Sequence, residues 1–128
     1  MRVFNLLVQT NAPLNTSFNS PYVQLKSIFM YNINAIITGT PNGILTLQAS
    51  NDPETNDTQT NPITNKPPAV GPSNWVTIRS SNFTVTTQSE NMWNVQGTAY
   101  NYVRVAYQDT SGGTSTATMD VIFNGKGM

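Results

Sequence analysis

Residues 27–50, "SIFMYNINAIITGTPNGILTLQAS", decide the fold class of this chain. Apolar and polar side chains alternate through the first half, with Phe29, Tyr31, Ile33, Ala35 and Ile37 on one face and Asn32, Asn34 and Thr38 on the other. A period of two is typical of a half-buried β-strand. The turn "TGTPNG" follows, in which Pro41 presets φ and Gly43 supplies a positive φ, and the alternation resumes in "ILTLQAS". The stretch therefore predicts two strands joined by a tight hairpin.

The same alternation recurs along the rest of the 128 residues, and no window has a convincing period of 3.6. Further strands are expected in "RVFNLLVQ", "YVQLKS", "NWVTIRS", "NFTVTT", "AYNYVRVAY" and "STATMDVIF". Seven or eight short strands separated by polar turns indicate an all-β fold, an antiparallel β-sandwich or jelly roll without a helix longer than two turns. The length suits a single domain, so we expect residues 1–128 to form one sandwich.

The last two of these strands are expected to pair as a hairpin through "QDTSGGT", with Val103 opposite Met119. Arg104 and Asp120 would then be diagonal neighbours on the other face, close enough for a partly exposed ion pair. The predicted core consists of apolar residues on the inward faces of the strands: Phe29, Ile33, Ile37, Leu45, Leu47, Ile78, Val103, Val105, Val121 and Phe123.

Composition excludes several classes of partner. Six basic and six acidic residues give a net charge of zero, and the six basic residues are scattered singly, so we expect no nucleic-acid surface. No run approaches the roughly 20 apolar residues of a membrane span, so no membrane partner is expected. The chain has no Cys and no His, which removes disulfides, thiolate metal sites and the commonest general base.

Two kinds of chemistry are left to consider. The acidic stretch "SNDPETND" offers Asp52, Glu54 and Asp57 as oxygen ligands for Ca²⁺, although it lacks the glycine and the final Glu of an EF-hand loop. Asn, Asp and Pro also simply form turns. The carboxylates outside this stretch lie beside turn or strand residues, and a Ser nucleophile would lack its His. We therefore expect neither an enzyme nor a bound cofactor, and treat calcium as a weak alternative.

The aromatic residues suggest a binding surface. Trp75, Trp93, Tyr100 and Tyr102 could form a platform on which sugar rings stack. Aromatic side chains in small sandwiches also serve as core residues or as anchors at protein interfaces. Both interpretations stay open at this point.

Residues 50–74 form a long loop that carries prolines at positions 53, 62, 67, 68 and 72 and almost no apolar residue. Loops of this length without their own structure are usually functional or disordered. Prolines lower the entropy that an arm loses when it is ordered against a partner. The loop is interpreted either as a contact arm, with Asn65, Pro67 and Pro68 as contact residues, or as an exposed insertion.

Three segments in order carry a resemblance: "GILTLQASNDP", "NWVTI" and "YNYVRVAYQDTSGGTSTATMDVIFNGKG". They resemble a group of small β-sandwich virion proteins of tailed bacteriophages and related phages, over roughly residues 25–127. The matched residues are Ser50, Asn51 and Asp52 in the turn after a strand, Trp75 in the Asn-Trp pair, and Arg104 in the Val-Arg-Val strand. The loop is longer than in the group, which leaves residues 53–73 without a counterpart.

The resemblance implies a non-enzymatic structural protein located in the virion. A capsid decoration or minor capsid protein that binds major capsid, tail or portal subunits is the first reading. The alternative is a carbohydrate- or receptor-binding module of a phage tail or spike, with a glycan as partner. As interaction residues we select Trp93, Tyr100, Tyr102 and Arg104 in addition to the loop residues.

Low charge also bears on assembly. With a net charge of zero, little electrostatic repulsion keeps copies apart, and the open edges of a sandwich must be covered, charged or paired. A homo-oligomer is therefore expected, with residues 1–20 and the 53–73 segment as the contact arms.

Overall fold

The computed structural model describes residues 2–25, 28–52, 72–96 and 100–127. These residues contain no helix and form ten strands. The strands are β1 (Arg2–Pro13), β2 (Phe18–Asn19), β3 (Val23–Gln24), β4 (Ile28–Thr38), β5 (Gly43–Ser50), β6 (Val76–Thr77), β7 (Phe83–Val85), β8 (Ser89–Gln96), β9 (Tyr102–Asp109) and β10 (Thr118–Gly127). An all-β fold is confirmed, with more strands than the seven or eight expected.

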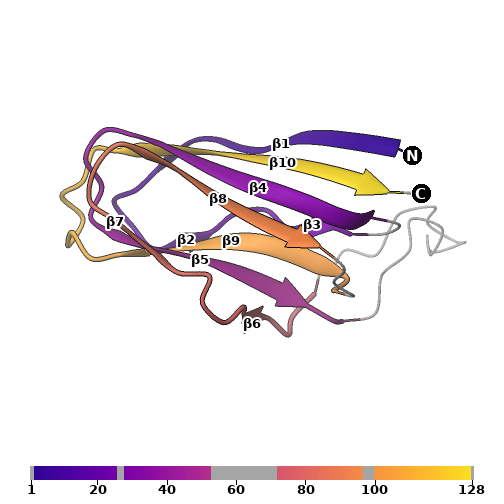
Figure 1. The fold of residues 1–128 in the computed structure, drawn as a ribbon. Coiled ribbons are helices and arrows are strands. Elements are labelled where there is room, and N and C mark those ends of the chain that lie inside the picture. Colours follow the sequence, from indigo (N-terminus) through magenta and orange to yellow (C-terminus); the bar gives the residue numbers. More distant parts are fainter. Residues whose placement is uncertain (1, 26–27, 53–71, 97–99, 128) are drawn as a thin grey trace, which may run out of the picture.

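The strands form two antiparallel sheets that face each other (Figure 1). One sheet has four strands in the order β1-β10-β4-β8. The other has the path β2-β9-β5-β6, with β3 also paired to β9 and β7 also paired to β5. The first sheet is built from long strands and the second from two long central strands with short ones along its edges. This arrangement confirms the predicted antiparallel β-sandwich.

The core lies between the sheets and is built from the inward residues of the long strands. Strand β4 shows the alternation most clearly, because every second residue from Tyr31 to Ile37 is buried. Eight of the ten predicted core residues are buried: Ile33, Ile37, Leu45, Leu47, Val103, Val105, Val121 and Phe123. Ile78 is partly buried and packs against this cluster.

Phe29 is the core prediction that is wrong, since 40% of its surface is exposed. Strand β4 has a register irregularity here: Met30 pairs with Lys126, whereas Gly127 pairs with Ile28. A bulge of this kind shifts the phase of the alternation by one residue. Ile28 therefore packs against the core in place of Phe29. The regular pattern of the sequence continues through this point and gave no sign of the bulge.

Both predicted hairpins are wrong, because each pair of consecutive strands lies in different sheets. Strand β4 pairs with β10 and β8, while β5 pairs with β9. The 39–42 and 110–117 connections therefore cross from one sheet to the other. The glycine with positive φ in the first connection is Gly39, with φ of 98°, and not Gly43. Alternation identifies a half-buried strand but does not say which strand pairs with it.

The ion pair expected between Arg104 and Asp120 is absent for the same reason. Arg104 points outward from the six-stranded sheet and Asp120 outward from the four-stranded sheet, so the two side chains lie on opposite sides of the sandwich. Asp120 instead accepts a hydrogen bond from the backbone N–H of Asn11 at 2.7 Å.

The strand expected in "RVFNLLVQ" is confirmed as β1, an edge strand paired with β10 along most of its length. The role of residues 1–20 as a contact arm stays a prediction. Strand β8, "SENMWNVQ", was not predicted, because Trp93 and Val95 are the only large apolar residues on its inward face. The other two inward residues are Ser89 and Asn91, so the segment lacks a clear apolar alternation.

Candidate interaction site

The two ends of the 50–74 loop are held together by Asp52. Its carboxylate accepts hydrogen bonds from the backbone N–H groups of Ser73 at 2.7 Å and Asn74 at 3.0 Å. The Asn74 side-chain amide donates a third bond at 2.9 Å. We call this arrangement of Asp52, Ser73 and Asn74 the loop-base staple. It brings residues 52 and 73, at the two ends of the loop, into contact.

Strand ends on both sides support the staple. The Ser50 hydroxyl accepts a bond from the Asp52 N–H at 3.1 Å, in the manner of a short polar turn. Asn101, just before β9, donates its side-chain amide to the Asp52 carbonyl at 2.8 Å. The Asn101 N–H donates to the Ser50 carbonyl at 3.0 Å, which joins this residue to the end of β5.

Next to the staple, Trp75 covers a charged side chain. Its ring lies 4.1 Å from the guanidinium carbon of Arg104, a cation–π contact. Arg104 also donates from Nε to the side-chain oxygen of Gln48 at 2.8 Å. Partial burial lowers the pKa of Arg104 from its ordinary value, although the guanidinium stays charged. The Trp75 indole N–H donates to the Pro72 carbonyl at 3.0 Å, which fixes the ring over the sheet.

Tyr22 extends this aromatic group outward. Its ring centroid lies 6.5 Å from that of Trp75 and 5.4 Å from that of Tyr102, which it meets edge-on. Tyr102 is 1% exposed, whereas Tyr22 is 48% exposed. The outer ring therefore covers the inner one and presents its own surface to solvent.

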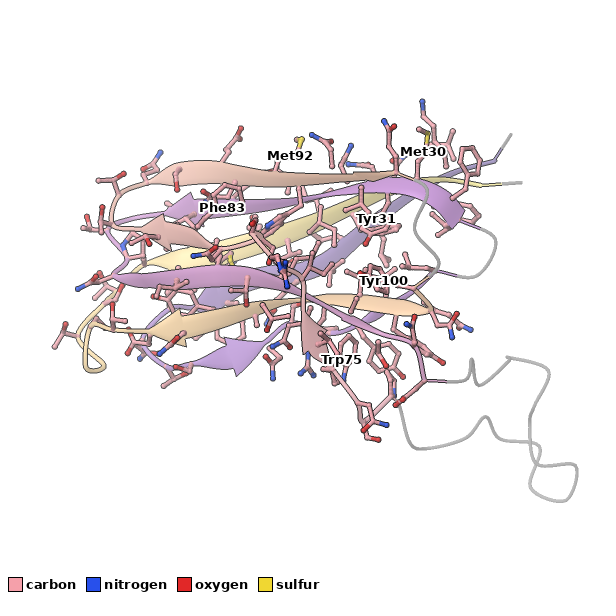
Figure 2. The ribbon with its side chains drawn as sticks, turned by 60° about the horizontal axis from the view of Figure 1, so that its bottom comes forward. Met30, Tyr31, Trp75, Phe83, Met92 and Tyr100 are labelled. Atoms are coloured by element: carbon pink, nitrogen blue, oxygen red, sulfur yellow. The ribbon has the colours of Figure 1, made fainter. Side chains whose placement is uncertain are left out.

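On the other side of the staple, Val76 is 69% exposed. It lines a pocket of about 350 Å³ together with Ala49, Asn51, Asp52, Asn74 and Tyr100. In Figure 2, Trp75 and Tyr100 lie toward the same end of the molecule. We use the name loop-base surface for the exposed parts of Tyr22 and Trp75, on the outer face of the sheet, together with Val76 on the other side of the edge strand, where the loop meets the sandwich.

The predicted platform of four aromatic rings is not assembled. Trp93 is 7% exposed and lies in the core, where its indole N–H donates to the Ser81 carbonyl at 2.7 Å. Tyr102 is buried beneath Tyr22. Trp75 and Tyr100 remain partly exposed. The structure therefore places Trp75, Tyr102 and Arg104 together and separates Trp93 from them.

The calcium hypothesis depends on residues that lie outside the described part of the chain. Glu54 and Asp57 belong to the 53–71 segment, as do the predicted contact residues Asn65, Pro67 and Pro68. Of the three candidate ligands, Asp52 is described, and both of its carboxylate oxygens already accept hydrogen bonds. Within the described ranges, no three acidic side chains are grouped closely enough to hold a metal ion.

Sequence reasoning missed Tyr22, Asn74 and Asn101 as parts of this site. Asn74 was visible as the residue before Trp75, but the staple depends on the chain returning to Asp52 after more than twenty residues. Tyr22 lies just before β3, in the strand expected from "YVQLKS", but the sequence did not show that this segment pairs with β9 beside Tyr102.

The staple gives a prediction for the dependence on pH. Hydrogen bonds from the Asn74 side chain and from the Asn74 and Ser73 amides lower the pKa of Asp52 from its ordinary value of 3.8. Because the folded pKa is the lower one, the stabilisation is fully present above the unfolded pKa and is lost as the pH falls through the folded pKa. In an NMR titration, the amide protons of Ser73 and Asn74 should shift together with a midpoint below 3.8.

In the Asp52→Asn variant, this shared titration should disappear. A midpoint at or above 3.8 in the natural chain would show that the staple does not hold the carboxylate in solution.

Comparisons with known proteins give the fold and no family. No protein-family model matches the sequence, and no curated protein is significantly similar to it. In the described part of the chain, no helix is long and apolar enough to cross a membrane.

Similar solved structures include the SPBc2 prophage-derived protein YomS, at 9% identity and a TM-score of 0.55, covering 97% of this chain and 92% of that one. A protein of the Bacillus endospore appendages, described as disulfide-linked pili, has 10% identity and a TM-score of 0.48 over 99% and 88% of the two chains. The coat protein of tobacco streak virus has 10% identity and a TM-score of 0.41 over 99% and 85%. The likeness to the prophage protein shows that the two chains share a β-sandwich fold over nearly their whole lengths.

Proposed function

We propose that this protein is a non-enzymatic structural component of a phage particle, a decoration or minor capsid protein that binds neighbouring virion subunits. The observation that carries the proposal is the loop-base staple next to the loop-base surface. The staple presents a segment of about twenty residues from one fixed point, beside exposed apolar and aromatic side chains. The phage-protein resemblance of the sequence supports the same conclusion.

Binding would rest on apolar contact and hydrogen bonds. Tyr22 and Trp75 are rigid rings that lose little conformational entropy when they are covered, and such rings are common anchors at protein interfaces. Val76 adds apolar surface next to a pocket that an apolar side chain of a partner could fill. The segment from 53 to 71 then acts as an arm along the partner. The role of Arg104 is to support Trp75 from beneath.

The alternative, a sugar-binding module built on Trp93, Tyr100 and Tyr102, is less well supported. Two of these three rings are buried, so they cannot stack on a sugar without unfolding their surroundings. We therefore propose one function.

Deleting residues 54–72 and closing the chain with a short glycine turn should leave the sandwich folded and reduce its occupancy on particles. The closure is feasible because the Asp52 carboxylate lies 2.7 Å from the Ser73 N–H, so the two ends already meet. Quantitative mass spectrometry of purified particles, made with the natural or the shortened chain, gives the number of copies bound. Circular dichroism checks the fold.

A matched variant, Tyr22→Ala, removes an exposed ring and leaves the loop intact. It should also lower the occupancy, whereas an exposed change elsewhere, such as Gln108→Ala, should not. Full occupancy of the shortened chain would show that the 53–71 segment is an insertion without a role in attachment.

A further inference from the structure

The outer face of the four-stranded sheet has an unusual order of side chains. An asparagine stands on each strand in one straight row, because Asn5 pairs with Asn124, Asn124 with Asn32 and Asn32 with Asn94. Within the row, the Asn124 side chain donates to that of Asn32 at 3.2 Å. The row is uncharged and offers amide donors and acceptors across the full width of the sheet.

The row beside it is mostly apolar. It consists of Leu7, Ile122, Asn34 and Met92, again one residue from each strand. Leu7 is 58% exposed and Met92 is 47% exposed. Figure 2 shows Met30 and Met92 on the outer side of the same sheet, away from the core. Single exposed apolar residues are normal on protein surfaces, but several apolar side chains in one row, here interrupted by Asn34, are suited to contact.

Among the described residues that point outward from this sheet, charged side chains lie only at its two ends. Lys126 stands at one end, opposite Val3 and Met30. Asp120 and Glu90 stand at the other end, on either side of Ile36. Lys126 lies six positions after Asp120 along β10, which is about 20 Å in a β-strand. The face therefore has a positive end and a negative end with two neutral rows between them.

The charges at the two ends of this face are complementary when two copies face each other in opposite directions. Consider a twofold axis that lies between the two facing sheets, parallel to their planes and perpendicular to the strands. Rotation about this axis reverses the direction of the strands and keeps their lateral order, so each strand lies over the same strand of the other copy. Lys126 of each copy then comes over Asp120 of the second copy, and Met30 over Ile36. At the centre, the asparagine row of each copy then lies over the row of Leu7, Ile122, Asn34 and Met92 of the other copy. Aligned packing of sheets, at about 30° between strand directions, is a common arrangement of β-sheets.

The available area suits a weak but specific contact. Four strands about 4.8 Å apart and the nine residues from Thr118 to Lys126 give a face of about 500 Å² per copy. Two copies would bury about 1,000 Å² in total, which is near the lower bound for a specific interface. Opposite charges at the ends would fix the register of the pair and disfavour a parallel arrangement, in which like charges meet.

We propose that two copies of this chain pair face to face through the outer surface of the β1-β10-β4-β8 sheet, antiparallel to one another, with Lys126 of each copy against Asp120 of the other. This pairing leaves the loop-base surface free, since that surface lies on the other sheet. A particle-bound protein could therefore bind a second copy of itself through one sheet and a virion subunit through the other.

Sedimentation velocity of the purified full chain tests this pairing without any particle, so its result is independent of the proposed function. The natural chain should show a concentration-dependent dimer that weakens when salt is raised from about 50 mM to about 500 mM, because the end charges are solvent-exposed. Ile122→Glu, at the centre of the face, should abolish the dimer. Val76→Glu, the same kind of change at an exposed position on the other sheet, should leave it unchanged.

Charge reversal tests the orientation. Lys126→Glu alone should weaken the dimer at least tenfold, and adding Asp120→Lys should restore it. Since Asp120 also accepts a bond from the Asn11 N–H, Asp120→Asn serves as a milder variant that keeps an acceptor and removes the charge, and it should weaken the dimer less. Circular dichroism confirms that each variant is folded.

Three results would overturn the proposal. The chain could remain monomeric at low salt even at the highest concentration at which it stays in solution. A dimer could form that Ile122→Glu does not affect, which would place the contact elsewhere. The double reversal could fail to restore a dimer that Lys126→Glu weakens, which would exclude the antiparallel orientation.

Discussion

Replacing Trp93 by alanine is expected to lower the free energy of unfolding by about 3–5 kcal/mol. The side chain is 7% exposed, and its ring centroid lies 5.3 Å from that of Phe83. Its indole N–H donates to the Ser81 carbonyl at 2.7 Å in a buried position. The alanine variant loses the ring contacts and also leaves this carbonyl without its buried donor. Urea denaturation followed by circular dichroism measures the change.

Two variants separate these contributions. Trp93→Phe keeps an aromatic ring and removes the N–H, so it should cost less than the alanine variant. Met92→Ala, at the adjacent outward position, should change the stability by less than about 1 kcal/mol, because Met92 is 47% exposed. If Trp93→Ala were nearly neutral for stability and abolished binding to a glycan, Trp93 would be a binding residue on the surface, and its assignment to the core would be wrong.

The second large effect is expected from Phe123→Ala, at about 3–5 kcal/mol. Phe123 is 1% exposed, and its ring is stacked on that of Tyr31 with centroids 5.5 Å apart. The variant would leave a cavity at the centre of the four-stranded sheet, where β10 pairs with both β1 and β4. The free energy of unfolding from urea denaturation again gives the value.

Phe29→Ala provides a control of identical chemistry. Because the bulge in β4 leaves Phe29 40% exposed, its loss should cost less than about 1.5 kcal/mol. Equal effects of the two substitutions would mean that Phe29 is buried and that the strand keeps a regular register to its start.

Alternation in the sequence was sufficient to find the long strands and most of the core. The pattern in β4, β5, β9 and β10 is strong, because each of these strands has one face in the core. It could not reveal the partners of each strand, since a strand that crosses to the other sheet and a strand that turns back as a hairpin bury the same residues. Both connections judged to be hairpins were of the crossing kind.

The candidate site was predictable only in part. Arg104, Trp75 and Asp52 were singled out by the resemblance, and the structure places them around the base of the loop. Their partners Tyr22 and Asn101 come from distant parts of the chain, and a row such as that of the four asparagines exists only once the strand order is known. Trp93 was misplaced because an aromatic residue in a polar segment resembles a surface residue until its neighbours are known.

The central proposal is that this protein is a structural part of a phage particle. Counting its copies by quantitative mass spectrometry, in density-purified particles of a phage whose genome carries this sequence, tests this most directly. The proposal predicts a fixed number of copies per particle, in a constant ratio to the major capsid protein from one preparation to the next. Absence of the chain from intact particles, when it is abundant in the lysate that produced them, would contradict it.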